Sequence, residues 1–221
     1  MSYRSNISFS GTNITLTSKE TLLQRNKLIG VDGIAYDWIH DNLYWTDNQK
    51  RTIEVLTLKE RYHKTVFDKN LVYPRGIAVD PRDDQKLMYW TDWGSKPKIE
   101  KAGLDGSNRA LVVATNLVWP NMVAIDYTDN RLFWTDSRLD RISSCGLNGE
   151  DVRIVLSSDA FTSHPFGIAI LNDMMFWSDW STKKVYRASK KDGRPVTELT
   201  SFRSLPRGLT IYHKLRQPIG K

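Results

Sequence analysis

Short apolar stretches bounded by polar residues recur along the chain, and each has a small residue at the same place. They read Gly33-Ile34-Ala35-Tyr36, Gly76-Ile77-Ala78-Val79, Val123-Ala124-Ile125 and Gly167-Ile168-Ala169-Ile170. A recurring alanine suits a crowded inner strand near a central axis. The stretch from Leu205 to Ile211 has the same pattern. We therefore expect it to form one more inner strand.

Each inner stretch is followed by further strand-like segments that complete a repeat of four. Alternating apolar and polar positions predict a third strand in each copy, at 52–55, 98–101, 141–144 and 184–187. Asp105-Gly106, Asn148-Gly149 and Asp192-Gly193 then predict hairpin turns, because glycine tolerates a positive φ. A fourth strand follows, as at 110–113 and 153–156. Four antiparallel strands in each repeat indicate the blades of a β-propeller.

Four similar tetrapeptides mark the second strand of each predicted blade. They are Tyr44-Trp45-Thr46-Asp47, Tyr89-Trp90-Thr91-Asp92, Phe133-Trp134-Thr135-Asp136 and Phe176-Trp177-Ser178-Asp179. Their tryptophans are 45, 44 and 43 residues apart. A period of roughly 40–50 residues with strand-like content is typical of propeller blades. The fold class predicted is therefore all-β.

The two ends of the chain predict an incomplete ring. Ser2-Tyr3-Arg4-Ser5 matches the third-strand pattern of Val185-Tyr186-Arg187-Ala188, so the chain is expected to begin inside a blade. The predicted divisions are repeats at about 1–30, 31–72, 73–118, 119–163 and 164–204, a closing strand at 205–213 and an exit linker at 214–221. This gives about four and a half blades plus a closing strand. Because the closing strand lacks partners, we expect a truncated propeller that is unstable alone.

Composition narrows the classes of function without choosing one. The 221 residues include 32 Lys and Arg against 25 Asp and Glu, which gives a net charge of +7. The basic residues are scattered, so we expect no nucleic-acid binding. Cys145 is the single cysteine, which excludes an internal disulfide and a Cys/His zinc spacing.

Targeting signals are sparse. The first residues contain no apolar signal-peptide region, and no window of 18 or more apolar residues occurs, so we expect no membrane contact by this segment. Two sequons, at Asn6 and Asn13, are candidate glycosylation sites if the chain is secreted.

The repeats resemble the YWTD, or class B, repeats of the low-density lipoprotein receptor family over nearly the whole chain. Besides the tetrapeptides, the resemblance rests on residues 37–47, Trp119-Pro120-Asn121, residues 163–167 and residues 212–218. It implies a six-bladed propeller flanked by EGF-like modules, with residues 214–221 leading into such a module. Departures from the family pattern are the missing upstream blades, Met122 in place of glycine, and Ser178 in place of threonine.

The tetrapeptides themselves are interpreted as structural. Their tryptophans can fill the gaps between blades, and their aspartates can accept hydrogen bonds from turn N–H groups. Equivalent aspartates in different blades lie apart around a ring, so we expect no metal and no other cofactor. Asp37, Asp80 and Asp126 end three inner strands, but Leu171 and Tyr212 stand at the matching places. We interpret these acids as turn residues and predict no catalytic residue, while a lactonase-like enzyme with central calcium is the least favoured alternative.

One face of the predicted disk collects aromatic and basic side chains. It carries the turns between second and third strands and the connections that lead into inner strands. We predict that this face binds a partner through Tyr73, Trp93, Trp119, His164, Phe166, Trp180, Arg75 and Arg207. Lys96, Arg138 and Lys183 are expected near it. The alternative is that these rings only cap the core below them.

The resemblance implies a module in the ectodomain of a longer single-pass receptor, on the cell surface and in endosomes. The function favoured is protein binding in an endocytic lipoprotein-type receptor. Its expected partners are the acidic ligand-binding modules of the same receptor, lipoproteins or other secreted ligands. A Wnt co-receptor and an extracellular-matrix propeller remain open.

Histidine changes charge between cell-surface and endosomal pH, so it is the candidate sensor for ligand release. His40, His63 and His213 are expected on the opposite face, in a 1→2 turn, in a 3→4 turn and at the far end of an inner strand. We therefore predict that His164 is the pH-sensing residue. The alternative is a neutral histidine that shapes the turn before Pro165.

Overall fold

The structure is a computed structural model that describes residues 7–10, 13–16, 28–82, 85–158 and 160–211. Every regular element in these residues is a β-strand, as the sequence predicted. No helix in this part of the chain is long and apolar enough to cross a membrane.

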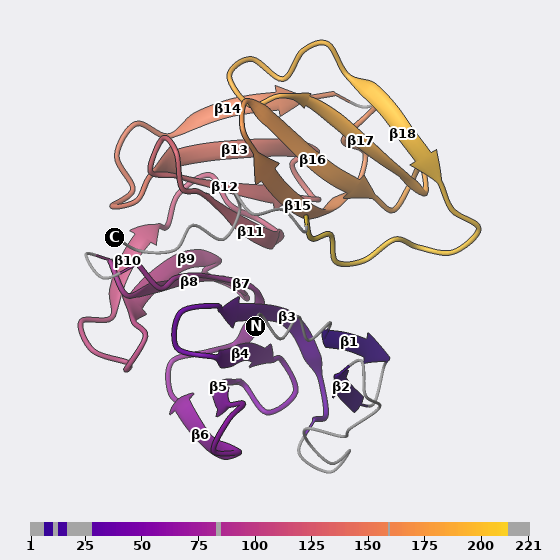
Figure 1. Ribbon diagram of the computed structural model, residues 1–221. Helices are drawn as coiled ribbons and strands as arrows, with labels where there is room; N and C mark the ends of the chain where they lie inside the picture. The colour runs from indigo at the N-terminus through magenta and orange to yellow at the C-terminus, as the bar shows by residue number, and fades with distance from the viewer. Residues whose placement is uncertain (1–6, 11–12, 17–27, 83–84, 159, 212–221) are drawn as a thin grey trace.

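Sixteen of the strands form four antiparallel sheets of four strands each, which follow one another along the chain (Figure 1). Blade 1 contains β3 (Val31–Asp37), β4 (Asn42–Asp47), β5 (Thr52–Thr57) and β6 (Tyr62–Phe67). Blade 2 contains β7 (Tyr73–Asp80), β8 (Leu87–Trp93), β9 (Lys98–Gly103) and β10 (Ala110–Val113). Blade 3 contains β11 (Pro120–Asp126), β12 (Arg131–Asp136), β13 (Arg141–Gly146) and β14 (Arg153–Ser157). Blade 4 contains β15 (Pro165–Leu171), β16 (Met174–Asp179), β17 (Lys184–Ser189) and β18 (Thr197–Ser201).

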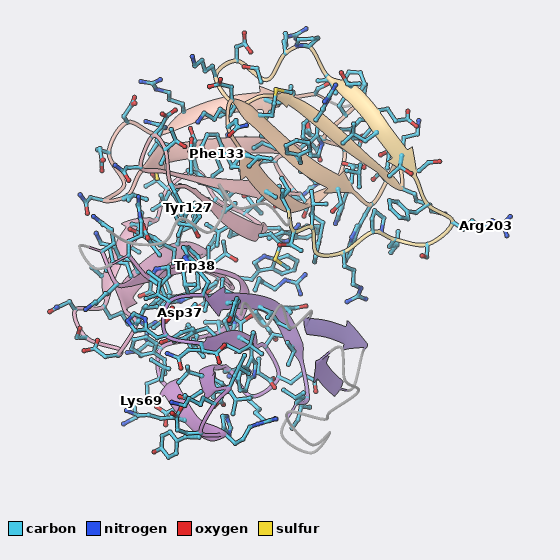
Figure 2. All side chains as sticks on the ribbon, in the orientation of Figure 1. Asp37, Trp38, Lys69, Tyr127, Phe133 and Arg203 are labelled. Atoms are coloured by element: carbon cyan, nitrogen blue, oxygen red, sulfur yellow. The ribbon has the colours of Figure 1, made fainter. Side chains whose placement is uncertain are left out.

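The inner strands β3, β7, β11 and β15 contact one another in succession, so they surround a common axis. They line a hollow of about 170 Å³. At one end of it the ring of Trp38 meets that of Tyr127 edge to face, with centroids 5.5 Å apart (Figure 2). The Tyr127 hydroxyl donates to the carbonyl of Val79 at 2.8 Å. These contacts connect blades 1, 2 and 3 at the axis.

Two segments outside the four blades bear on the predicted ring. β1 (Ile7–Ser10) and β2 (Asn13–Leu16) pair as a separate antiparallel hairpin. The expected third strand at 2–5 lies outside the described residues. Residues 212 and 213, the end of the expected closing strand, also lie outside them. The expected strand Leu205–Ile211 was wrong, because these residues form no strand. They lie beside β15 in the place of a next inner strand, and they pair with no strand among the described residues.

The tetrapeptides lie on the second strand of each blade, as predicted, and their aromatic side chains join neighbouring blades. The four tryptophans are almost fully buried. The first aromatic residue of one tetrapeptide shares a core cluster with the tryptophan of the next: Tyr44 with Trp90, Tyr89 with Trp134, and Phe133 with Trp177. Because side chains alternate along a strand, one ring faces the following blade and the other faces the preceding blade.

The third tetrapeptide residue connects each blade to the next through its hydroxyl. The Thr91 hydroxyl accepts the N–H of Gly76 at 2.9 Å within blade 2 and donates to the carbonyl of Asn121 in blade 3 at 2.6 Å. The same pair of bonds recurs at Thr46, Thr135 and Ser178. Serine at 178 therefore keeps both hydrogen bonds, since it keeps the hydroxyl.

This contact explains the glycine near the start of the inner strands. A Cβ atom at Gly76 would lie 2.6 Å from the carbonyl oxygen of Asn121, and a Cβ at Gly33 would lie 2.4 Å from that of Arg75. Blade 3 has Met122 there instead. Its N–H lies 3.2 Å from the Thr135 hydroxyl, whereas the three glycines lie 2.9 Å from theirs. The methionine is accommodated with a longer hydrogen bond.

The predicted hairpin turns are present between the third and fourth strands. Gly106, Gly149 and Gly193 have φ values of 90°, 91° and 71°, in the region that favours glycine. Each turn packs onto the fourth strand of the preceding blade, because a Cβ at Gly149 would lie 2.1 Å from the carbonyl oxygen of Val112. These glycines thus serve the turn and the joint between blades.

The acids that end three inner strands are paired with basic side chains. Asp37 accepts from the ring of His40, and Asp80 forms an ion pair with Arg82. Asp126 pairs with Lys190 of blade 4, and both side chains are about 3% exposed. Asp37 and Asp126 also accept turn N–H groups, as expected of turn residues.

Lys190 replaces a leucine of the other blades. Its N–H donates to the carbonyl of Asp173, as the N–H groups of Leu58 and Leu104 donate to the matching carbonyls in blades 1 and 2. Burial alone would lower the pKa of Lys190, but Asp126 and Asp129 together raise it above its ordinary value. The contribution of these ion pairs to the stability of the fold is therefore fully present at neutral pH. It is lost only as pH rises through the raised pKa.

We predict that Thr91→Val lowers the free energy of unfolding by roughly 2–4 kcal/mol. Valine keeps the shape but leaves the buried N–H of Gly76 and carbonyl of Asn121 without their partner. Urea denaturation measures the change. Thr115→Val, at an exposed position, is the control and should shift stability by less than about 0.5 kcal/mol. Equal effects of the two substitutions would show that the hydroxyl link contributes nothing.

We also predict that Lys190→Leu costs about 3–5 kcal/mol, because it leaves the buried Asp126 carboxylate without its cation. The double variant Lys190→Leu/Asp126→Asn should be more stable than Lys190→Leu alone, since it removes the buried charge. Chemical denaturation of the four proteins in the cycle measures the coupling. Additive losses in the double variant would contradict this account.

Candidate protein-binding face

Tetrapeptide aspartates build the face by holding two kinds of loop together. The Asp136 carboxylate accepts the N–H groups of Val118 and Trp119, which lead into β11. It also accepts those of Arg138 and Leu139, in the turn after β12. Asp47 makes both sets of bonds in blade 1. Asp179 does the same in blade 4, so in these three blades both loops are fixed at one end of the sheet.

Four rings on these loops form a continuous row, here called the aromatic row: Trp93, Trp119, His164 and Trp180. Trp93 stacks on Trp119 with centroids 5.7 Å apart and planes at 19°. Trp119 lies 6.5 Å from His164, which stacks on Trp180 at 5.2 Å with planes at 6°. The row crosses blades 2, 3 and 4, so no single repeat contains it.

The outer indoles are anchored to the part of the chain that follows their blade. Trp93 Nε1 donates to the carbonyl of Pro120 at 2.7 Å, and Trp180 Nε1 donates to that of Pro206 at 2.8 Å. With their N–H groups satisfied and their positions fixed, these rings can contact a partner at little entropic cost.

Arginines flank the aromatic row. The guanidinium of Arg75 lies 4.1 Å from the Trp93 ring and forms an ion pair with Asp32 at 2.7 Å. Burial lowers the pKa of Arg75, while Asp32 opposes that shift; arginine nevertheless stays charged at neutral pH. Arg138 lies 6.0 Å from the Trp119 ring, and Arg207 lies 5.8 Å from that of Trp180. The face therefore presents stacked rings with positive charge beside them.

The structure brings most of the predicted residues together. Tyr73 and Trp119 are 48% and 41% exposed, while Trp93, His164 and Trp180 are half-buried. Tyr73 lies at the start of β7 with Arg51 5.9 Å from its ring. Lys96 and Lys183 are exposed on the same set of turns.

The prediction that Phe166 contacts a partner needs correction. This residue is only 2% exposed, and its ring stacks on Trp180 at 4.2 Å. It therefore supports the aromatic row from below and cannot itself contact a partner. The alternative that a ring caps the core holds at this position, because its neighbours Trp180 and Arg75 cover it.

Sequence reasoning missed one charged residue and several exposed apolar ones. Asp32 holds Arg75 in an ion pair. The sequence signal that could have identified Asp32 is its position directly before Gly33, which is equivalent to the position of Arg75 before Gly76. Exposed apolar side chains precede three inner strands, at Ile29, Val72 and Val118, and another lies after blade 4, at Leu205. They extend the apolar part of the face beyond the row.

The other histidines lie elsewhere. His40 is in the turn after β3, as expected, and its ring lies 2.9 Å from the Asp37 carboxylate. His63 lies in β6 rather than in a turn, stacks on Trp45 at 5.3 Å and contacts Glu54 at 3.0 Å. His213 is outside the described residues, as is Asn6, while Asn13 begins β2.

The described residues offer little for catalysis or metal binding. No group of three or more His, Cys, Asp or Glu side chains among them could hold a metal ion. Cys145 is buried, and burial raises the pKa of its thiol to about 12. Such a thiol stays protonated and is inert as a nucleophile.

A propeller with YWTD-type blades and an exposed aromatic face defines a class of binding modules. Residues 41–81, 86–127 and 130–170 match the model of the low-density lipoprotein receptor repeat class B. The chain belongs to this family.

Relatives support the same assignment. The chain is 35% identical over 201 residues to the vitellogenin receptor Yl of Drosophila melanogaster, which covers 91% of the chain and 10% of that receptor. It is 34% identical to the vitellogenin receptor of Solenopsis invicta, over 98% of the chain and 12% of the receptor. A human low-density lipoprotein receptor-related protein 5-like protein is 33% identical over 77% of the chain and 66% of its own length. The chain thus spans about a tenth of the two insect receptors.

Solved structures share the fold. A chain of the nidogen/laminin complex superposes with a TM-score of 0.78 and 28% identity, over 89% of this chain and 75% of that one. The catalytically inactive virginiamycin B lyase of Staphylococcus aureus superposes with a TM-score of 0.63 at 19% identity, over 80% of this chain and 58% of the lyase. The second likeness concerns the fold alone.

Proposed function

We propose that this chain is a protein-binding module in the ectodomain of an endocytic lipoprotein-type receptor. The observation that carries the proposal is the aromatic row with Arg75, Arg138 and Arg207 beside it. Partly exposed tryptophans and arginines dominate the binding energy of many protein interfaces. Membership of the class B repeat family and similarity to two vitellogenin receptors support the receptor assignment.

The charge of the face favours an acidic partner. Arg138 and Arg207 are exposed, and the net charge of the chain is +7. Acidic, calcium-loaded ligand-binding modules of the same receptor fit this chemistry, as do acidic segments of secreted ligands. In this proposal the chain acts at the cell surface and in endosomes without catalysing a reaction.

A Wnt co-receptor is the second candidate. The observation in its favour is the 33% identity to the human receptor-related protein 5-like protein, which extends over 66% of that protein. A matrix propeller is a third, on the likeness to a chain of the nidogen/laminin complex. All three use protein binding, and they differ in the ligand bound.

We predict that Trp93→Ala and Trp119→Ala each weaken binding to a recombinant pair of acidic, calcium-loaded ligand-binding modules. The loss expected is about 2 kcal/mol or more for each, or roughly thirtyfold in Kd, because both rings are anchors of the row. Calorimetry measures the affinity. Tyr62→Ala, an exposed ring on β6 outside the row, is the control and should leave the Kd unchanged. Equal affinity in all variants with intact folds would move the binding site elsewhere.

We further propose that His164 responds to acidification. The imidazole ring of His164 lies beside the rings of Trp119 and Trp180, and the guanidinium groups of Arg138 and Arg207 lie over the same two rings. The backbone N–H of His164 donates to the Asp179 carboxylate. A protonated imidazole adds a positive charge to the row, and a carboxylate of the partner favours that form. The complex is therefore expected to tighten as pH falls.

The test compares affinity for the same modules at pH 7.4 and 5.5. With His164 present, binding should be tighter at pH 5.5. In His164→Ala this pH dependence should shrink, while His40→Ala, outside the row, should keep it. An unchanged pH dependence in His164→Ala assigns the response to another residue.

A further inference from the structure

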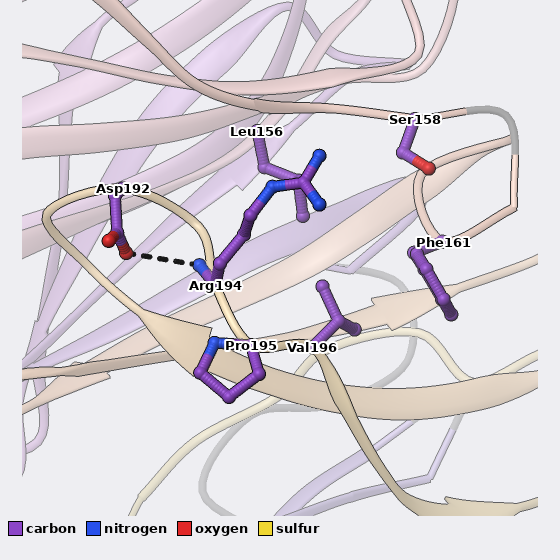
Figure 3. A pocket seen from close by; sticks show the side chains of 7 residues that line it. All are labelled: Leu156, Ser158, Phe161, Asp192, Arg194, Pro195 and Val196. Carbon is purple, nitrogen blue, oxygen red and sulfur yellow. Dashed lines mark hydrogen bonds between the residues drawn. The ribbon is translucent and has the colours of Figure 1, made fainter.

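A hollow of about 560 Å³ lies at the outer edge of the joint between blades 3 and 4 (Figure 3). Its size is within the range of pockets that hold ligands or large side chains. None of its lining residues belongs to the aromatic row. They are Leu156, Ser158 and Phe161 from the end of blade 3, and Asp192, Arg194, Pro195 and Val196 from blade 4.

The equivalent joint between blades 1 and 2 is filled by one side chain. The guanidinium of Arg109 lies 4.9 Å from the Phe67 ring and 5.2 Å from the Trp90 ring. It forms an ion pair with Glu100 at 2.7 Å. It also donates to the carbonyls at 69 and 70, at 2.8 and 2.9 Å. The chain thus supplies its own occupant for that joint.

Strand register shows which residues take these places in blade 4. Glu100 lies opposite the tetrapeptide tryptophan of its blade, and Tyr186 has that position in blade 4. Arg109 stands two residues before the partner of Glu100 on the fourth strand, and Val196 stands two residues before the partner of Tyr186. The arginine and its carboxylate are therefore replaced by a valine and a tyrosine.

The replacement leaves a hollow with apolar side chains on one side, where the guanidinium lies in the first joint. Leu156 takes the place of Phe67, since each pairs with the isoleucine of its third strand. The Phe161 ring meets Tyr186 edge to face at 5.6 Å. Its carbonyl accepts the indole N–H of Trp177 at 2.8 Å, which fixes this wall. The walls suit an apolar side chain.

A positive charge stands at the mouth of the hollow. Figure 3 shows the Arg194 side chain extending beside Leu156. No ion pair of its guanidinium is present among the residues the structure describes. Asp192 instead accepts the backbone N–H of Arg194 at 3.1 Å. That bond, with the hydroxyl of Ser189, lowers the pKa of Asp192, so this carboxylate stays ionised within the turn.

We propose that this hollow is a second docking pocket, for a segment of a partner protein with a large apolar side chain followed by a carboxylate. The apolar side chain enters between Leu156, Phe161 and Val196, and the carboxylate pairs with Arg194. Charge complementarity selects this occupant, because the hollow supplies apolar side chains and an exposed guanidinium that forms no ion pair among the described residues, while Asp192, the carboxylate of the lining, is bound to the backbone N–H of its own turn.

Three blocked tetrapeptides test the proposal on the 221-residue chain: Gly-Phe-Asp-Gly, Gly-Phe-Asn-Gly and Gly-Ala-Asp-Gly. Titrations followed by amide NMR shifts should show saturable changes at Ser158, Phe161, Arg194 and Val196. The Phe-Asp peptide should bind roughly two- to fivefold more tightly than Phe-Asn, the range of a partly exposed ion pair. It should bind roughly tenfold or more tightly than Ala-Asp, because burial of the phenyl ring is lost.

Two variants separate the parts of the pocket. Arg194→Gln should reduce Phe-Asp binding to the level of Phe-Asn, whereas Lys191→Gln, an exposed lysine on the same turn, should change nothing. Val196→Arg places an arginine where Arg109 stands in blade 2 and should reduce binding at least tenfold. Because Val196 is half-buried, the urea midpoint of that variant is measured too, and Arg194→Gln gives the independent result.

Three outcomes would overturn the proposal. Equal affinity for Phe-Asp and Ala-Asp would show an anion contact without a pocket. Equal affinity of Phe-Asp for the original chain and Arg194→Gln would remove the charge selection. A dimer in sedimentation that Val196→Arg prevents would make a second copy of the chain the occupant.

Discussion

A buried hydroxyl group holds each blade against the next, and the geometry of the inner strands follows from it. The hydroxyls of Thr91 and its counterparts accept an N–H from their own blade and donate to a carbonyl of the following one. This brings two backbones close enough that glycine is needed at Gly33 and Gly76. The tetrapeptide aspartate works one residue further on, where it holds the loops. One short motif therefore fixes the joint between blades and the loops of the binding face.

Local pattern was enough to predict the strands of the four blades, because each depends on alternation and turn chemistry within about 45 residues. The hydrogen bonds of the aspartates followed from the same reasoning. The hydroxyl link was not predictable, since it joins residues of different repeats, such as Thr91 and Asn121. The strand expected at 205–211 failed for a related reason: the pattern is that of a strand, but strand structure needs a hydrogen-bonded neighbour.

The candidate face was predicted in outline and wrong in one detail. Blade topology placed Trp93, Trp119, His164 and Trp180 on one face, and the ring contacts join them into a row. Phe166 belongs to the same loops but is buried, because the Trp180 ring and the Arg75 guanidinium pack against its ring. Asp32 and Arg75 occupy the equivalent position in other blades and pair there. The repeat determines the position of a residue on its blade, whereas the exposure of its side chain depends on residues of neighbouring repeats.

The aromatic row has a mechanical consequence. Its end members, Trp93 and Trp180, stand on different sheets; the indole N–H of Trp93 is tied to the sheet that follows, and that of Trp180 to the segment after blade 4. A ligand that grips both ends therefore acts as a brace across three sheets. A ligand held by all three sheets binds their attached arrangement in preference to a separated one, so its binding and the mutual attachment of the sheets are thermodynamically linked. Substitutions deep in a blade joint should thus be felt at the surface as altered affinity, without any change in the residues that touch the ligand.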